Sequence, residues 1–109
     1  MTTDSTKNLF REAMKFFREN NLQQAIAKLE TALEQEPEFL DGLEALGQMY
    51  FKAQRLDDAI RVTEKFSALS PNAVMAHTNL SRLYQKKGMI KEAEDELAKA
   101  RLLSSNNRK

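Results

Sequence analysis

The feature that most constrains this chain is an internal repeat of 34 residues. Three copies align when the sequence is shifted by that interval, and several columns keep one kind of residue in each copy. These columns are Ala25, Ala59 and Ala93; Phe16, Tyr50 and Tyr84; Ala13, Gly47 and Ser81; Leu22, Leu56 and Ile90; and the pair Pro37 and Pro71. Such a period predicts one small structural unit that recurs along the chain and packs against its neighbours.

Composition predicts that each unit is helical. The 109 residues include only three glycines and two prolines, and they are rich in strong helix formers, which favours an all-α fold in a single domain. Breaks in the helical pattern are expected within the copies at Asn20-Asn21, Gln54-Arg55 and Lys87-Gly88, and between copies at the two prolines. Six helices follow from these breaks.

Gly47 lies inside one of the expected helices, where glycine costs roughly 1 kcal/mol relative to alanine. Ala13 and Ser81 occupy the same column in the other copies, so every copy has a small residue there. This column predicts a point where the two helices of one repeat approach closely.

The spacing resembles the tetratricopeptide repeat. The middle copy matches that pattern best, with Leu43, Leu46-Gly47, Tyr50, Ala59 and Pro71 in the characteristic places. The resemblance extends from about Thr6 to the C-terminus. It implies a right-handed α-solenoid of three helix-turn-helix units, six antiparallel helices in all, with no dedicated C-terminal capping helix evident. The repeats are expected at about 6–39, 40–73 and 74–105, between a short flexible tail at 1–5 and a polar tail at 106–109.

The two ends of the expected solenoid are polar. Glu12 and Lys15 occupy columns that are apolar in the later copies, and Glu94 and Arg101 replace smaller or apolar residues of the earlier ones. This pattern predicts outer faces that meet water instead of a further repeat. Leu102-Leu103 is the exception, and these leucines could contact a partner or a second copy.

Composition also excludes several classes of protein. There is no cysteine, so a disulfide framework or a thiolate metal site is ruled out. Seventeen basic residues nearly balance sixteen acidic ones, which argues against a nucleic-acid binder. No apolar run approaches the roughly 20 residues of a membrane span, and the first residues lack the apolar stretch of a signal peptide. We therefore expect a soluble cytoplasmic protein, although a fragment of a longer chain would look the same.

Catalytic groups are not apparent in the sequence. His77 is the single histidine and shares a column with Leu9 and Leu43, so we expect it to pack between helices. The acidic pair Asp57-Asp58 and the stretch from Glu92 to Glu96 are interpreted as solvated helix starts. We expect no enzyme activity, no metal site and no cofactor.

The family resemblance implies that the first helices of successive repeats line a concave groove that binds a partner. Phe10, Met14 and Phe17 form a stripe at i, i+4 and i+7 on the expected first helix, and Phe51 lies one repeat after Phe17. Basic residues recur at Arg18, Lys52 and Lys86. The candidate groove residues are Phe10, Met14, Phe17, Arg18, Gln48, Phe51, Lys52, Arg82, Gln85 and Lys86. Two plainer interpretations stay open: a first helix that buries a wide apolar face, and basic residues that are simply solvated.

The leading hypothesis is a protein-interaction module or adaptor. Its partner would be another protein that offers a short peptide or amphipathic helix with apolar residues and some acidic character. The alternatives are a structural scaffold that self-assembles into a homo-oligomer through its groove or C-terminal helix, and a secretion-type chaperone. Relatives that clamp the acidic tails of heat-shock chaperones carry Lys and Asn at columns that hold Phe10, Met14 and Ala45 here, so that specialised role is not expected.

Overall fold

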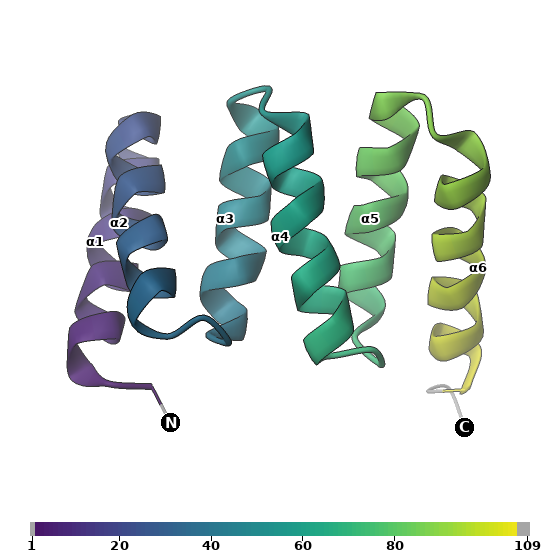
Figure 1. Ribbon diagram of the computed structural model, residues 1–109, viewed down its shortest axis with the longest axis horizontal. Helices are drawn as coiled ribbons and strands as arrows, with labels where there is room; N and C mark the ends of the chain where they lie inside the picture. Colours follow the sequence, from purple (N-terminus) through teal and green to yellow (C-terminus); the bar gives the residue numbers. More distant parts are fainter. Residues whose placement is uncertain (1, 107–109) are drawn as a thin grey trace.

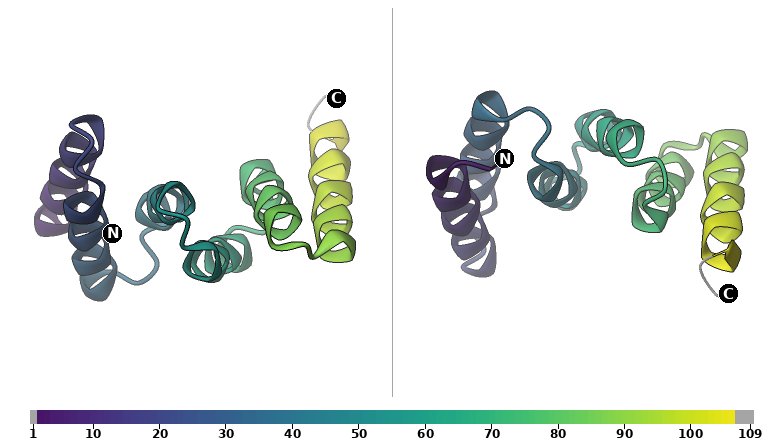
Figure 2. Two further views of the ribbon diagram at one scale, coloured as in Figure 1. Left: turned by 90° about the horizontal axis from the view of Figure 1, so that it is seen from above. Right: turned by 90° about the horizontal axis from the view of Figure 1, so that it is seen from below.

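The computed structural model describes residues 2–106, which form six α-helices in three antiparallel pairs (Figure 1). The helices are α1 (Asp4–Arg18), α2 (Leu22–Gln35), α3 (Leu40–Lys52), α4 (Leu56–Leu69), α5 (Val74–Lys87) and α6 (Ile90–Asn106). Views from above and below place α3 and α5 toward one side of the molecule and α4 toward the other (Figure 2). No strand occurs within residues 2–106. The predicted all-α fold of three helix-turn-helix units is confirmed.

The turns within the three pairs are built alike. Asn20, Gln54 and Gly88, spaced by the repeat length, have positive φ angles of 64°, 63° and 87°. This left-handed conformation ends a helix and lets the chain reverse. The next residue then donates its N–H to a carbonyl of the preceding helix: Asn21 to Phe16, Arg55 to Tyr50 and Met89 to Tyr84, each at 2.8 Å. The three predicted breaks are therefore confirmed.

The helical part of the chain extends further at both ends than the sequence indicated. α1 begins at Asp4 because the Thr3 hydroxyl accepts a hydrogen bond from the Thr6 N–H, so the predicted flexible tail at 1–5 is wrong for its last two residues. At the other end α6 continues through Asn106, the first residue of the predicted polar tail. Residues 107–109 of that tail lie outside the described residues.

Apolar side chains form one large cluster and one small one. The large cluster runs from Ala13 on α1 to Leu83 on α5, and Leu29, Leu43 and Tyr50 are among its most deeply buried members. The small cluster joins α5 to α6 and consists of Leu80, Tyr84 and Ala93, with Ile60 and Met89 packed against it. The first two repeats thus hold most of the apolar core.

Two hydrogen bonds tie successive repeats together. The Tyr50 hydroxyl donates to Glu30 on α2, and the Tyr84 hydroxyl donates to Glu64 on α4 at 2.6 Å. The same bond therefore recurs at the repeat interval. The first copy has Phe16 in this column, which lacks a hydroxyl.

The small-residue column marks a close approach, as predicted. A Cβ atom added at Gly47 would lie 2.6 Å from Oγ1 of Thr63 on α4, a distance at which one of the two groups must move. The predicted polar faces are also confirmed, because Glu12, Lys15, Glu94 and Arg101 are exposed.

The last repeat buries a histidine and a glutamate. His77 is buried as expected, but it makes hydrogen bonds as well as packing contacts. The interpretation of the stretch from Glu92 to Glu96 as solvated is wrong for Glu96, which is only 9% exposed. α6 begins at Ile90, so Glu96 lies on its second turn and on the face that meets α5.

Candidate functional site

A pocket of about 210 Å³ lies where α1, α3, α4 and α5 converge. Four of the predicted groove residues line it: Phe17, Gln48, Phe51 and Arg82. The remaining lining residues are Gly47, Thr63, Asn79 and Leu83. Three successive first helices therefore contribute side chains to one hollow, as the groove hypothesis requires.

A second hollow of about 500 Å³ adjoins this pocket through Phe51. Its other lining residues are Lys52, Gln54, Leu56 and Lys86, which come from the ends of α3 and α5, the turn before α4 and the first residue of α4. We call the two hollows together the groove. They bring together Phe17, Gln48, Phe51, Lys52, Arg82 and Lys86 of the ten predicted residues.

Two cations of the groove lie beside aromatic rings of the preceding repeat. Lys52 Nζ is 5.0 Å from the centre of the Phe17 ring, and Arg82 Cζ is 5.9 Å from the centre of the Phe51 ring. Both distances are within the range of cation–π attraction. Asn79 Oδ1 also accepts a hydrogen bond of 3.4 Å from Arg82. These contacts orient the charges over apolar surface.

The positive charges of the groove are not neutralised by the protein. None of the ion pairs among residues 2–106 involves Lys52, Arg82 or Lys86. An anionic group of a ligand can therefore approach these side chains without displacing a carboxylate of the chain.

Four predicted groove residues do not line either hollow. The Phe10 ring packs edge-on against Phe39, which precedes α3, with ring centres 5.5 Å apart. Met14 is half-buried against the large apolar cluster, while Arg18 and Gln85 are exposed. Part of the apolar stripe on α1 thus belongs to a wide buried face, as the plainer interpretation of that stripe holds.

Sequence reasoning missed the residues that create space for the pocket. Gly47 has no side chain, and Thr63 occupies a column that holds Leu29 and Leu97 in the other repeats. Both residues line the pocket, and neither has a side chain long enough to fill it. The replacement of leucine by threonine in that column was the available signal.

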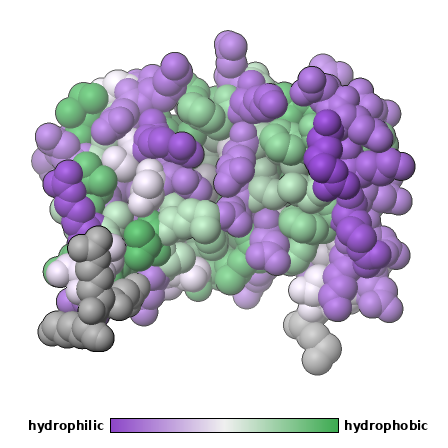
Figure 3. Space-filling view, turned by 180° about the vertical axis from the view of Figure 1, so that it is seen from behind, coloured by the Kyte–Doolittle hydropathy of each residue, from purple (hydrophilic) through white to green (hydrophobic). Residues whose placement is uncertain are grey.

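The side of the molecule that carries α3 and α5 has a mixed surface (Figure 3). Hydrophobic side chains reach the surface across its middle, and hydrophilic side chains interrupt them. A larger hollow of about 690 Å³ lies near the α2–α3 connection. Among the described residues that line it, Glu36, Glu38 and Asp41 are acidic and none is basic. The Thr3 N–H donates to Glu36, and this bond holds the pKa of that carboxyl below its usual value.

The residues of the groove suit binding better than catalysis. They supply aromatic rings, amides, ammonium groups and a guanidinium, while the single histidine is buried elsewhere. Within the described part of the chain, no group of three or more His, Cys, Asp or Glu residues could hold a metal ion. No helix in residues 2–106 combines the length and apolar character needed to cross a bilayer.

Comparisons with known proteins agree with the repeat pattern. The sequence matches a family model described as tetratricopeptide repeat over residues 10–73. The crystal structure of MamA superposes with a TM-score of 0.91 at 24% identity, and the match covers 95% of this chain and 61% of the MamA chain. No curated protein sequence matches.

Two further solved structures contain a bound peptide. They are the second and first TPR of Spaghetti (RPAP3), both described as bound to the HSP90 peptide SRMEEVD. Their TM-scores are 0.84 and 0.85 at 16% and 17% identity, and the matches cover 92% and 97% of this chain and 93% and 86% of theirs. At these identities the likeness concerns the fold.

Proposed function

The chain belongs to the tetratricopeptide repeat family, and we propose that it is a non-enzymatic protein-interaction module that holds a short segment of a partner protein in its groove. The segment has apolar side chains and some acidic character. It lies extended or as a single amphipathic helix across α1, α3 and α5.

The observation that carries this proposal is the pairing of rings with free cations. An apolar side chain of the segment enters the pocket beside Phe17 and Phe51. A neighbouring carboxylate of the same segment then meets Arg82 and Lys86, where a charge-assisted hydrogen bond is stronger than a neutral one. Apolar surface thus supplies affinity, and the cations select for an acidic partner.

The RPAP3 domains supply a precedent for acidic ligands on this fold, since SRMEEVD contains two glutamates and an aspartate. The groove described above offers aromatic rings beside its cations. We therefore expect SRMEEVD itself to bind weakly compared with a segment that also has a large apolar residue.

A displayed library of random peptides tests the proposal because it samples many candidate segments at once. We expect selection on the wild-type protein to enrich peptides that combine aromatic or aliphatic residues with Asp or Glu. The variant Arg82→Glu/Lys86→Glu should lose binding of the enriched peptides by at least about tenfold, since two charge contacts are reversed.

A matched control exists on α4. Arg61→Glu/Lys65→Glu makes the same change of charge at the same i, i+4 spacing on exposed residues outside the groove. This control should keep its affinity. Equal losses in both variants, or enrichment of peptides without acidic residues, would overturn the proposal.

The role of Phe17 and Phe51 in binding should be tested with a substitution that removes less apolar volume than alanine does. Phe17 and Phe51 are half-buried and pack against the large apolar cluster, so truncation would weaken the fold as well as the groove. Phe17→Leu/Phe51→Leu keeps most of the apolar volume and removes both cation–π contacts. We expect weaker peptide binding with little change in the thermal midpoint.

Self-assembly is the second candidate function. Leu102 on α6 is 65% exposed, so its side chain is available for an apolar contact with another copy. Light scattering at several concentrations separates the candidates, because a monomer at tens of micromolar argues against assembly. A role as a secretion-type chaperone stays a prediction, and it would require co-purification with an export substrate.

A further inference from the structure

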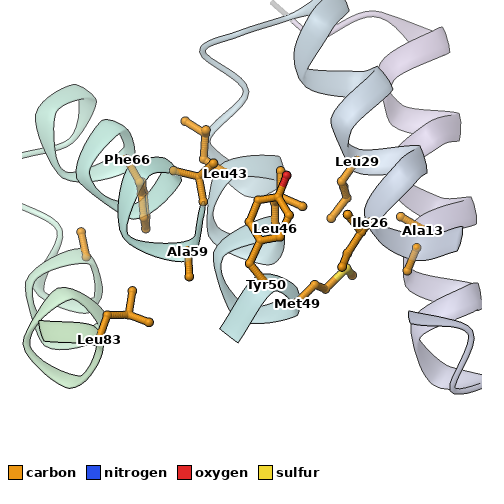
Figure 4. Close-up of a cluster of buried hydrophobic side chains, with 13 residues drawn as sticks. Ala13, Ile26, Leu29, Leu43, Leu46, Met49, Tyr50, Ala59, Phe66 and Leu83 are labelled. Atoms are coloured by element: carbon orange, nitrogen blue, oxygen red, sulfur yellow. The ribbon is translucent and has the colours of Figure 1, made fainter. Parts of the chain in front are cut away.

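A hydroxyl group lies at the inner end of the pocket formed by α1, α3, α4 and α5. Thr63 on α4 lines this pocket but is only 3% exposed. Leu83 on α5 lines it as well, and this buried leucine belongs to the large apolar cluster (Figure 4). Gln48 and Arg82 line the same pocket but are exposed. Thr63 and Leu83 therefore form the inner end of the pocket, and Gln48 and Arg82 lie at its mouth.

The Thr63 hydroxyl has no hydrogen-bond partner among the described residues. The side-chain hydrogen bonds of residues 2–106 include one from Thr31 and one from Thr78, each to the backbone carbonyl four residues earlier, but none that involves Thr63. Within the same residues, no fully enclosed side-chain nitrogen or oxygen lacks a partner. The Thr63 oxygen is therefore not sealed between helices, and it opens into the pocket that the residue lines.

Gly47 keeps this hydroxyl uncovered. A Cβ atom at Gly47 would lie 2.6 Å from Oγ1 of Thr63, so any larger residue there would block the oxygen. The other two repeats have Leu29 and Leu97 in the Thr63 column and no glycine opposite them. The open hydroxyl is thus particular to the second repeat, in the middle of the groove.

The walls of the pocket suit one aromatic side chain. Phe17 and Phe51 line it, and aromatic rings attract one another in offset or edge-on contact. The Arg82 guanidinium, already 5.9 Å from the centre of the Phe51 ring, can also contact a second ring. The volume of about 210 Å³ is below the range of about 300 to 1,000 Å³ typical of small-molecule sites. The pocket therefore fits a side chain of a partner better than a whole small molecule.

The Thr63 hydroxyl distinguishes between the side chains that could enter. A phenylalanine ring would displace water from this hydroxyl and offer no hydrogen bond in return, which is costly for a buried polar group. A carboxylate at the same depth would lose its hydration while the cations stay at the mouth. A tyrosine hydroxyl can either donate to Oγ1 or accept from it, and its ring fills the space between the walls.

We propose that this pocket is a tyrosine subsite, in which the ring lies beside Phe17 and Phe51 and the phenol hydroxyl is hydrogen-bonded to Thr63. The inference rests on the proposed function, because it names the residue by which the partner segment is anchored. The acidic residue of that segment then lies next to the tyrosine, near Arg82. A site that hydrogen-bonds a buried hydroxyl of its ligand rejects the analogue that lacks it. Tyrosine should therefore bind more tightly than phenylalanine by about tenfold.

Two uncharged probes test the subsite without knowledge of the partner. They are N-acetyl-L-tyrosinamide and N-acetyl-L-phenylalaninamide, which differ by one hydroxyl. Titration into ¹⁵N-labelled protein, followed by NMR, should shift the backbone amides of Gly47, Thr63 and Asn79. We expect the dissociation constant of the tyrosine probe to be about tenfold lower than that of the phenylalanine probe.

Three variants assign the preference to the hydroxyl of Thr63. Thr63→Val keeps the shape of the side chain and should fold, since the hydroxyl has no partner in the protein to lose. It should bring the two probes to within about twofold of each other. Thr63→Ser keeps the hydroxyl and should keep the preference. The matched control is Thr31→Val on α2, outside the groove, which should bind both probes as the wild type does.

Two results would overturn the subsite: equal affinity of the wild type for both probes, including no binding of either, and a preference for tyrosine that survives in Thr63→Val. Neither result bears on the proposed function, because acidic peptides could still be enriched and still be lost in Arg82→Glu/Lys86→Glu. Conversely, if that variant keeps its peptides, the proposed function fails, while the uncharged probes still measure the preference for tyrosine.

Discussion

The second and third repeats share a backbone plan but join their helices differently. Leu43 on α3 and Val62 on α4 are both buried in the large apolar cluster. His77 and Glu96 join α5 and α6 by a hydrogen bond between buried polar side chains, 2.8 Å from Nδ1 to Oε1. The difference shows that a repeat column specifies a place in the structure and leaves the chemistry at that place free to vary.

This contrast bears on the groove as well. Arg82 and Lys86 lie on α5, the helix whose buried face carries His77. Phe51 and Lys52 lie on α3, which belongs to the large apolar cluster. Helix α5 also contributes Ala76 and Leu83 to the large cluster. The two walls of the groove therefore share apolar core, and they differ in the buried histidine that α5 alone carries.

The largest expected difference comes from one leucine column. Leu46 and Leu80 occupy equivalent places and are 2% and 3% exposed, but Leu46 belongs to the large cluster and Leu80 to the small one. We expect Leu46→Ala to lower the free energy of unfolding by about 4 kcal/mol and Leu80→Ala by about 2 kcal/mol. Urea unfolding followed by circular dichroism measures both, and equal costs would contradict the division of the core.

A smaller effect is expected where the second repeat is most tightly packed. Gly47→Val should destabilise the protein by about 1 to 3 kcal/mol, since the new side chain meets Thr63. Gly47→Ala should cost less, and less still in a Thr63→Ala background, where the opposing hydroxyl is gone. A thermal unfolding curve unchanged by Gly47→Val would show that α3 and α4 can separate without cost.

The smallest expected effects on stability come from removing the two tyrosine hydrogen bonds that join successive repeats. Tyr50→Phe and Tyr84→Phe each remove one hydrogen bond to a glutamate and should each cost about 1 kcal/mol, with additive effects because the two bonds share no residue. Unequal costs in urea unfolding would show that one repeat interface depends more on its tie than the other.

The same two tyrosines should make the stability of the protein depend on pH in alkaline solution. Burial, with the hydrogen bond to Glu30, raises the pKa of Tyr50 to about 12 from 10.0, and burial raises the pKa of Tyr84 as well. A raised pKa means that the folded state holds its proton more tightly than the unfolded chain. Stability should therefore fall as the pH rises from 10.0 toward 12, and Tyr50→Phe should lessen that fall.

Much of this architecture could be predicted from the sequence because it depends on local and periodic information. The turn residues Asn20, Gln54 and Gly88 recur at the repeat length, and each adopts a positive φ angle. The small column predicted the contact of Gly47 with α4. The sequence did not indicate that Phe10 packs against Phe39, because Phe39 lies in a connection and belongs to no periodic pattern.

By itself, the sequence determined six helices, their pairing, their turns and the columns that face the core, since these follow from residue type and spacing along one chain. Only the tertiary structure decided which side chains meet across different helices. Lys52 beside Phe17, Arg82 beside Phe51 and His77 against Glu96 depend on distances of a few ångströms between separate helices. A periodic pattern places residues on a face, but side-chain packing determines which of them stay free to bind and which become buried partners.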